Sequence, residues 1–328
     1  MTEATRPRVL QMGKMPLPAL DADLAREFDI TVLSDQPDRA QFLAQRGAEF
    51  EYFVTSAGMG APAQVIQALP RLRCISSFGV GFDSLDRASI LARGARVGYT
   101  PGVLDDCVAD MAFALLLDSA RHVAAADRFV RTGLWPQQRF GVYTKASGKR
   151  LGILGMGRIG LQVARRASGF DMDVAYHNRR PVADSAHQYM ASLQELAAWC
   201  DFLVITAAGG SETQHLVDAT VLQALGPQGF LVNVARGSVV DEAALLHALQ
   251  NGTIAGAGLD VFEDEPHPLP GLLLQDNVVL APHIASGTQE TRRAMADLVL
   301  ANLRSFIAHG SLAQEVPWSQ AAAAARAE

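Results

Sequence analysis

Short apolar runs alternate with helical patterns along the first hundred residues of the chain. Four runs have the length and composition of buried strands, and residues 38–45 and 61–68 between them show helical spacing of apolar positions. Strands that alternate with helices are joined by crossover connections, so this pattern predicts a parallel sheet. The four predicted strands are residues 8–12, 30–33, 52–55 and 74–78.

The same alternation returns in the second half, after a long helical pattern. Apolar positions three and four apart predict a helix over residues 101–122 that carries the chain to a second domain. Residues 290–306 are again amphipathic and are expected to return the chain to the first domain, whereas the alanine-rich tail at 321–325 is expected to fray. The predicted strands of this half are residues 151–154, 173–177, 202–206, 230–233, 255–260 and 278–280.

A glycine-rich loop, Gly155-Met156-Gly157-Arg158-Ile159-Gly160, directly follows the first of these strands. A dinucleotide site needs a strand, a tight turn and a helix in this order. Gly155 makes the turn, Gly157 lets the backbone approach the pyrophosphate, and Gly160 lets the helix pack on the strand. We therefore predict a Rossmann-type cofactor site, with Arg158 and Ile159 at its helical end, rather than a plain turn before a helix.

Composition and charge narrow the class of protein. The 328 residues are long for one hydrophobic core and suggest two domains. The net charge is −6 and the basic residues are scattered, so neither nucleic acid nor an anionic membrane is expected as a partner.

The N-terminus lacks an apolar signal segment and the longest apolar run, residues 111–117, is too short to span a bilayer, which predicts a cytoplasmic protein. Cys74, Cys107 and Cys200 show neither metal-ligand nor disulfide spacing, so we expect no metal site and three thiols in a reducing compartment.

Three residue types suited to carbonyl reduction follow the glycine-rich loop. Glu265 and His283 stand eighteen residues apart, with Arg236 upstream. Reduction of a 2-oxo acid needs a hydride donor, a proton donor for the developing alkoxide, and cationic or N–H groups for the carboxylate. Singly, a histidine after proline is more often a loop residue, an arginine before glycine a surface charge, and an acid before proline a solvated group.

Six motifs, in order, resemble the D-isomer-specific 2-hydroxyacid dehydrogenase family over roughly residues 50 to 305. Within that family the chain is most similar to the glyoxylate/hydroxypyruvate reductases and to their hydroxyphenylpyruvate and 2-ketogluconate reductase relatives. The motifs are Phe78-Gly79-Val80-Gly81-Phe82-Asp83, Thr100-Pro101-Gly102-Val103-Leu104, Gly152-Ile153-Leu154-Gly155-Met156-Gly157-Arg158-Ile159-Gly160, Asn233-Val234-Ala235-Arg236-Gly237, Gly258-Leu259-Asp260-Val261-Phe262-Glu263-Asp264-Glu265-Pro266 and Pro282-His283-Ile284-Ala285-Ser286.

The resemblance implies an α/β fold of two doubly wound, Rossmann-like domains with parallel sheets and a cleft between them. The substrate domain would be discontinuous, formed by residues 1–100 and 287–328, with a dinucleotide-binding domain inserted at residues 101–286. It also implies a homodimer that reduces a small 2-oxo acid, of the glyoxylate/hydroxypyruvate type, to the D-2-hydroxy acid.

The resemblance further implies a role for each matching residue. His283 would give its proton to the substrate carbonyl oxygen, and Glu265 would hydrogen-bond the other ring nitrogen. A carboxylate partner favours the imidazolium form, so the histidine would remain a competent acid near neutral pH. The residues alone do not choose among Glu263, Asp264 and Glu265; the family pattern selects the acid directly before Pro266.

Substrate and cofactor contacts are implied in the same way. Arg236 would straddle the carboxylate and carbonyl oxygen, a task its planar fork suits better than lysine. The N–H groups of Val80 and Gly81 would hold the carboxylate. Asp260 matches the family position that contacts the nicotinamide carboxamide, and its alternative is a turn cap at the end of a strand. Two further residues, Val234 and Ala235, are assigned to the cofactor site.

Cofactor choice is where the chain departs from the NAD-using majority of the family. A fold specific for NAD usually ends its second strand with an acid that binds the ribose 2′-hydroxyl. Here the strand at residues 173–177 is followed by Asn178-Arg179-Arg180. Asparagine can donate a hydrogen bond to a 2′-phosphate and the arginines can neutralise it. We therefore predict NADP(H) as the preferred cofactor, with NAD(H) possible; otherwise the arginines form a solvated basic turn.

Two segments bear on the substrate. Gly58-Met59-Gly60 is a small, open loop that would admit glyoxylate, hydroxypyruvate or a larger 2-keto sugar acid. The stretch with Trp135, Arg139 and Phe140 matches an arm that relatives extend over the partner's active site. These side chains would then line the neighbouring pocket; alternatively, the tryptophan packs in its own core.

A different class of function stays open. Nicotinamide-sensing corepressors similar to C-terminal-binding protein use this fold and keep the same arginine, glutamate and histidine. The lack of an evident recruitment tail or partner-peptide signal argues against that class. Formate dehydrogenases pair their histidine with glutamine, so Glu265 disfavours them.

Overall fold

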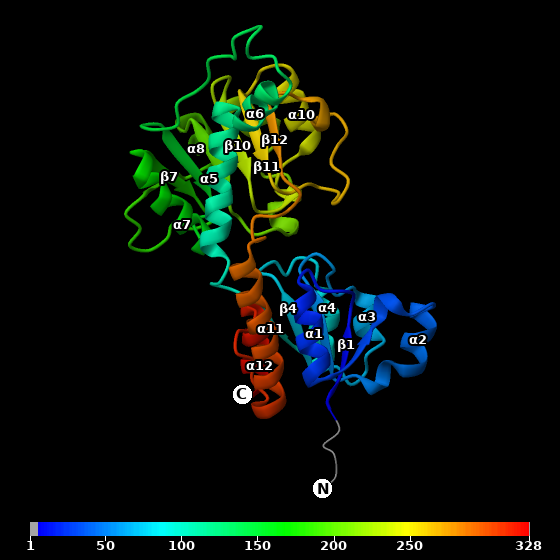
Figure 1. The fold of residues 1–328 in the computed structure, drawn as a ribbon. Helices are drawn as coiled ribbons and strands as arrows, with labels where there is room; N and C mark the ends of the chain where they lie inside the picture. Colours follow the sequence, from blue (N-terminus) through cyan, green and yellow to red (C-terminus); the bar gives the residue numbers. More distant parts are fainter. Residues whose placement is uncertain (1–5, 328) are drawn as a thin grey trace. The chain divides into compact units, whose positions relative to one another are not determined.

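The computed structural model describes residues 6–327, and the chain divides into two compact units. The first unit holds the chain up to Leu104 and again from Thr288, and the second runs from Asp105 to Gly287. Each unit is an α/β layer structure around one parallel sheet (Figure 1). The predicted α/β class and parallel sheets are therefore confirmed.

The first unit contains a five-stranded parallel sheet in the order β2-β1-β3-β4-β5. Leu10, Phe53 and Ile75 lie in one hydrophobic cluster on this sheet. The strands are β1 (Arg8–Gln11), β2 (Asp29–Val32), β3 (Tyr52–Ser56), β4 (Cys74–Phe78) and β5 (Arg96–Gly98). The helices are α1 (Pro18–Glu27), α2 (Arg39–Arg46), α3 (Ala63–Gln67), α4 (Arg87–Arg93), α11 (Gln289–His309) and α12 (Pro317–Ala327).

Helices from the end of the chain complete this first unit. The Ser76 hydroxyl on β4 donates to the Val299 carbonyl on α11 at 3.1 Å, and the Val97 N–H on β5 donates to the Ser319 hydroxyl on α12 at 3.0 Å. The prediction that the alanine-rich tail frays is wrong, because α12 continues through it. Alanine has the strongest intrinsic helix preference, and the contact through Ser319 fixes the start of the helix against β5.

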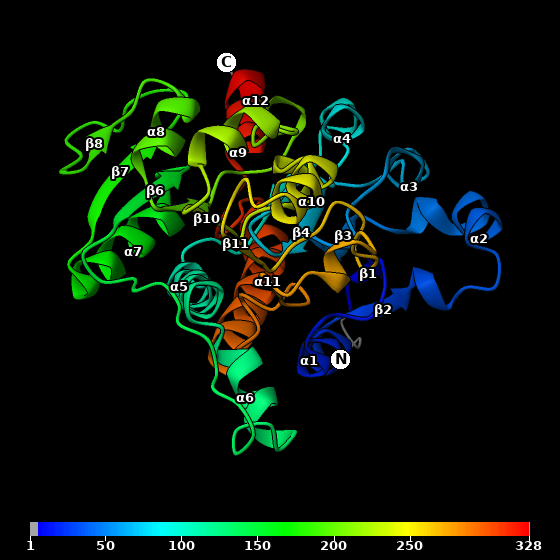
Figure 2. The same ribbon diagram turned by 90° about the horizontal axis from the view of Figure 1, so that it is seen from above.

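The second unit contains a seven-stranded parallel sheet in the order β12-β11-β10-β9-β6-β7-β8. Helices α8, α9 and α10 cover one face and share a core cluster with the strands, while α5 and α7 cover the other (Figure 2). The strands are β6 (Arg150–Leu154), β7 (Asp173–His177), β8 (Gln188–Tyr189), β9 (Phe202–Ile205), β10 (Phe230–Asn233), β11 (Gly256–Leu259) and β12 (Val278–Leu280). The helices are α5 (Asp105–Arg121), α6 (Val123–Arg131), α7 (Arg158–Ala167), α8 (Leu193–Trp199), α9 (Ala219–Leu225) and α10 (Glu242–Gln250).

The predicted long helix is shorter than expected at its start. Helix α5 begins at Asp105, because Gly102 takes a backbone φ of 82° that interrupts helical geometry after Pro101. At the other end, His122 takes a left-handed φ of 54° and separates α5 from α6, a helix that is not among those predicted from the sequence. No helix among residues 6–327 has the length and apolar character needed to cross a membrane.

The strand order of the second unit places its ligand-binding edge. Strand β6 lies between β7 and β9, and the chain leaves β6 for β7 on one side before it returns to β9 on the other. A doubly wound sheet binds its ligand beyond the carboxyl ends of the strands at such a reversal. The loop after β6 therefore lies at the point where a dinucleotide is expected.

Asp260, directly after β11, fastens the turn that follows β12. Its two carboxylate oxygens accept the N–H groups of Ile284 and Ala285, each at 2.8 Å, and the side chain is fully buried. Burial raises the pKa of the Asp260 carboxyl, although the two N–H groups and the nearby His283 act in the opposite direction. The Asp260 carbonyl also accepts the His283 N–H at 2.8 Å, so one residue holds three successive N–H groups of this turn.

We expect Asp260→Asn to destabilise the second unit by about 1–3 kcal/mol, because the amide offers one acceptor oxygen and points its own N–H donors at a backbone N–H. The free energy of unfolding in urea measures this loss. Asp276→Asn makes the same chemical change at an exposed position and should alter stability by less than about 0.5 kcal/mol. Equal stability of the two variants would contradict the fastening role of Asp260.

Candidate active site

The three glycines of the loop after β6 have distinct surroundings. Gly155 has a φ of 104°, and a Cβ there would lie 2.5 Å from the Ala207 nitrogen. A Cβ at Gly160 would lie 2.5 Å from the Gly155 carbonyl oxygen, so α7 packs closely on the loop. Gly157, at the N-cap of α7, faces open space instead. The loop thus offers a helix N-terminus without an obstructing side chain, which fits a pyrophosphate.

Residues Arg158 and Ile159 open α7 beside this space. The Arg158 Nε lies 3.6 Å from an Asp105 carboxylate oxygen. The guanidinium is more than half exposed, so its charge stays accessible to an anion at the helix end. The cofactor role of both residues remains a prediction.

Asn178, after β7, is oriented by the glycine-rich loop. Its Oδ1 accepts the Met156 N–H at 2.7 Å, which leaves the amide NH₂ as the group able to donate elsewhere. The Tyr189 hydroxyl donates to the Asn178 carbonyl at 3.2 Å, and the Tyr176 hydroxyl accepts the Val182 N–H at 2.9 Å. The turn that carries the asparagine and the two following arginines is therefore held at both ends.

The two arginines of this turn differ in their surroundings. Arg179 forms an ion pair with Glu212, which lies in the loop after β9. Arg180 is exposed and makes no ion pair with any residue in the described part of the chain. The two arginines directly follow Asn178 in the chain, beyond the carboxyl end of β7.

His283 and Glu265 are directly hydrogen-bonded. The His283 Nδ1 lies 2.6 Å from Glu265 Oε2, and the other carboxylate oxygen accepts the Phe262 N–H at 3.1 Å. Burial alone would raise the pKa of the Glu265 carboxyl, but the bond and charge of His283, the Phe262 N–H and the charge of Arg236 outweigh it, so that pKa lies below its usual value. The carboxylate therefore stays ionised and orients the ring, with Nε2 at the opposite side.

Arg236 lies on the turn after β10, against the turn that carries Glu265. A Cβ at Gly237 would overlap the peptide that joins Phe262 to Glu263, so the two turns touch through their backbones. The Arg236 carbonyl accepts the Asn233 side-chain amide at 2.8 Å. The structure thus brings Arg236, Glu265 and His283 together within the second unit.

The acids that crowd Glu265 in sequence are separated by their partners. Glu263 pairs with the ring of His215, and Asp264 lies 4.0 Å from His267 at the surface. Glu265 is the one of the three that meets His283, in agreement with the family pattern. His215 and Glu212 were not singled out from the sequence, because both contacts join loops that only the folded sheet brings together.

The remaining predicted site residues are placed less directly. Val234 and Ala235 are nearly buried, and their N–H groups bond to Ile205 and Asn233. The Ala235 carbonyl accepts the Arg236 guanidinium at 2.7 Å, so a cofactor contact would use the Val234 carbonyl or the two side chains. Asp260 has the turn-cap geometry described above, and its nicotinamide contact stays a prediction.

Val80 and Gly81 belong to the first unit. They follow β4 on a loop where Gly79 has a φ of 139° and donates its N–H to the Thr100 hydroxyl at 3.0 Å. Within residues 6–327, the Val80 and Gly81 N–H groups make no hydrogen bond. Both donors are thus available to an anionic ligand.

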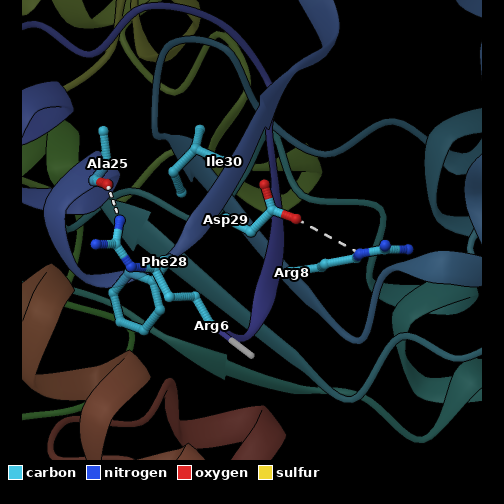
Figure 3. Close-up of a pocket in the computed structure, with 6 residues that line it drawn as sticks. All are labelled: Arg6, Arg8, Ala25, Phe28, Asp29 and Ile30. Atoms are coloured by element: carbon cyan, nitrogen blue, oxygen red, sulfur yellow. Dashed lines mark hydrogen bonds and ion pairs between the residues drawn. The ribbon is translucent and has the colours of Figure 1, made fainter. Parts of the chain in front are cut away.

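Two surface hollows have linings that include none of the catalytic, substrate-binding or cofactor residues predicted from the sequence. One, of about 490 Å³, lies at the amino ends of β1 and β2 (Figure 3). Its arginines are engaged: Arg6 donates to the Ala25 carbonyl, and Arg8 lies against Asp29 and Glu49. The other, of about 680 Å³, lies beside α6 and includes Phe140, whose ring stands 5.2 Å from those of Phe129 and Tyr143. Trp135 is two-thirds exposed, so within one chain it is not a core side chain.

Comparison with known proteins identifies the family. Residues 113–285 match the family described as D-isomer specific 2-hydroxyacid dehydrogenase, NAD binding domain. The chain is 44% identical to hydroxyphenylpyruvate reductase of Plectranthus scutellarioides, over 87% of this chain and 91% of that protein. It is also 44% identical to 2-ketogluconate reductase of Gluconobacter oxydans, over 79% and 83%. A solved NADPH-dependent glyoxylate/hydroxypyruvate reductase from Sinorhizobium meliloti, in complex with NADP and malonate, superposes with a TM-score of 0.91 at 40% identity, over 96% of this chain and 98% of that one. The chain therefore belongs to the D-isomer-specific 2-hydroxyacid dehydrogenase family of NAD(P)-dependent oxidoreductases.

Proposed function

We propose that this enzyme reduces a small 2-oxo acid of the glyoxylate/hydroxypyruvate type to the D-2-hydroxy acid, with NADPH as the preferred cofactor. The observation that carries the proposal is the His283–Glu265 hydrogen bond beside Arg236, an acid with its orienting carboxylate and an anion-binding fork in one place. The similarity to a glyoxylate/hydroxypyruvate reductase supports the substrate class.

The chain's own residues divide the work of the reduction. The bound nicotinamide supplies the hydride. His283 holds the proton at Nε2 for the carbonyl oxygen, because Nδ1 is occupied by Glu265. The ionised Glu265 stabilises the charged ring before that proton is given up. Asp260 keeps the backbone of the turn that carries His283 in place.

Substrate anchoring falls to Arg236 and to backbone N–H groups. A planar guanidinium can bind the substrate carboxylate and the carbonyl oxygen together. The N–H groups of Val80 and Gly81, which have no hydrogen-bond partner among the described residues, are proposed as donors to a substrate carboxylate. Met59 belongs to the Gly58-Met59-Gly60 loop that is expected to select the substrate; it is half-buried, and its flexible thioether approaches Gly13. 2-Ketogluconate and hydroxyphenylpyruvate, the substrates in the names of the two relatives, are the alternative substrates.

Preference for NADPH is supported by the turn after β7. Asn178 offers its amide NH₂, and Arg179 and Arg180 place two positive charges beside it. Val234, Ala235 and Asp260 are proposed for the nicotinamide end, and Gly155, Gly157 and Gly160 with Arg158 and Ile159 for the pyrophosphate.

The homodimer and the cytoplasmic location remain predictions from the sequence. Support for the dimer comes from apolar side chains in the segment from α6 to residue 143 that a single chain leaves exposed. Their exposed fractions are 52% for Val130, 66% for Trp135 and 99% for Val142.

Steady-state assays with a panel of 2-oxo acids test the proposed function. We expect oxidation of NADPH with glyoxylate and hydroxypyruvate, and kcat/KM for NADPH at least several-fold above that for NADH, because charge-assisted bonds to the 2′-phosphate add binding energy. Turnover of none of these acids, or an NADH preference, would refute the respective part of the proposal.

Glu265→Gln tests the acid and its partner. The amide supports the charged ring less than a carboxylate does, so the pH above which reduction slows should move down relative to the parent. The matched control is Glu263→Gln, which removes the same charge from the acid that pairs with His215 and should leave the position of the pH limb unchanged. If the pH limb shifts in the control but not in Glu265→Gln, then Glu263 and not Glu265 is the partner of the catalytic acid.

The cofactor turn is tested by Arg179→Ala combined with Arg180→Ala. Charge-assisted bonds of roughly 1.5–3 kcal/mol each, reduced by solvent, predict a rise of about tenfold or more in KM for NADPH and little change for NADH. Asn178→Asp, added to both, should invert the preference, since the carboxylate still accepts the Met156 N–H but repels the phosphate. Arg165→Ala, at the exposed far end of α7, is the control. Equal effects on the KM values for both cofactors would show that the arginines do not bind the 2′-phosphate and only form a solvated basic turn.

A further inference from the structure

We propose that Glu212 competes with the cofactor's 2′-phosphate for the Arg179 guanidinium and so limits how strongly the enzyme prefers NADPH over NADH. The inference rests on the proposed NADPH preference and adds an opposing residue to it. Its basis is the Arg179–Glu212 ion pair, which joins two loops of the second unit.

The strand order shows what this ion pair spans. Arg179 follows β7, Glu212 lies in the short helical turn Ser211–Thr213 after β9, and β6 runs between those two strands. The pair therefore crosses the carboxyl end of β6, where the glycine-rich loop lies. This is the reversal point of the sheet, at which a dinucleotide's adenosine half is expected to enter.

Both ends of the ion pair are held by their own loops. The Asn178 carbonyl, next to Arg179, accepts the Tyr189 hydroxyl. On the other side, the Thr213 hydroxyl donates to the Ala208 carbonyl at 2.8 Å, and the Thr213 N–H donates to the Gly210 carbonyl at 3.0 Å. Glu212 is thus presented by an ordered turn, and Arg179 reaches it with a long, flexible side chain.

The charges decide which cofactor is affected. A 2′-phosphate and the Glu212 carboxylate are both anions that one guanidinium cannot pair with fully at once. The 2′-hydroxyl of NADH is neutral and does not draw Arg179 away. Because Arg179 and Glu212 are 82% and 73% exposed, the competition is modest, in the range of an exposed ion pair. Arg180, the next residue along the chain, is exposed and remains able to meet the phosphate.

The test is a double-mutant cycle on binding rather than on turnover. Dissociation constants for NADPH and NADH are measured by fluorescence titration of the cofactor-free protein at low ionic strength. We expect Glu212→Gln to tighten NADPH by about 1.5- to 5-fold and to leave NADH unchanged. In an Arg179→Ala background the same change should have no effect. Asp173→Asn, at the exposed start of β7 and thus the opposite edge of the sheet, removes an equal charge and should change neither constant.

The outcomes separate this inference from the proposed function. Tightening that persists without Arg179, or that is equal for both cofactors, would overturn competition in favour of a general charge effect. If the parent prefers NADPH through Arg179 but Glu212→Gln binds like the parent, the inference fails and the NADPH proposal stands. The parent could bind both cofactors equally, and Glu212→Gln could then prefer NADPH only when Arg179 is present. That result would support the inference and correct the cofactor proposal. No preference in either protein would refute both.

Discussion

Contact between two backbones at Gly237 is the constraint on which the candidate active site depends. The turn after β10 carries Arg236, and the turn after β11 carries Glu265; a side chain at Gly237 would overlap the Phe262–Glu263 peptide between them. Only a residue without a Cβ lets these turns approach so closely. The charge of Arg236 then reaches the Glu265 carboxyl and helps to lower its pKa.

Paired polar groups hold the rest of the site around this contact. Asp260 binds the N–H groups of the turn after β12, and that turn presents His283 to Glu265. His215 lies against Glu263 and His283 against Glu265, so these two carboxylates do not share one imidazole. Each of these two histidines is therefore paired with one carboxylate, and which carboxylate it is depends on the loop that lies beside the ring. A buried carboxylate with its hydrogen bonds satisfied is a costly group to disturb, which gives the turn its rigidity.

At the edge of the sheet proposed to bind the cofactor, the polar contacts are exposed and weak rather than buried and strong. The arginines after β7 are exposed, and their ion pair is the kind that contributes little to stability. Weak pairing at an exposed edge is compatible with ligand exchange, since a phosphate can replace a carboxylate at small cost. The proposed preference between cofactors thus depends on differences between weak interactions, whereas the proposed proton donor, His283, is held by strongly fixed ones.

Much of this protein is determined by the sequence alone. Apolar runs of strand length predicted the long strands of both sheets, because burial on both faces of a parallel sheet demands them. The glycine spacing predicted the turn after β6, since it reflects local backbone geometry. The short strands β5 and β8 were not predicted because neither contains an apolar run, and the break between α5 and α6 was not predicted because a left-handed His122 is not visible in apolar spacing. The choice of Glu265 over Glu263 needed family resemblance, because three consecutive acids are chemically alike.

Only the tertiary structure paired Glu263 with His215, Glu212 with Arg179 and the Asp260 carboxylate with a turn more than twenty residues away. These contacts join loops at one edge of a sheet, and their partners are set by strand order, which no local pattern of residues encodes.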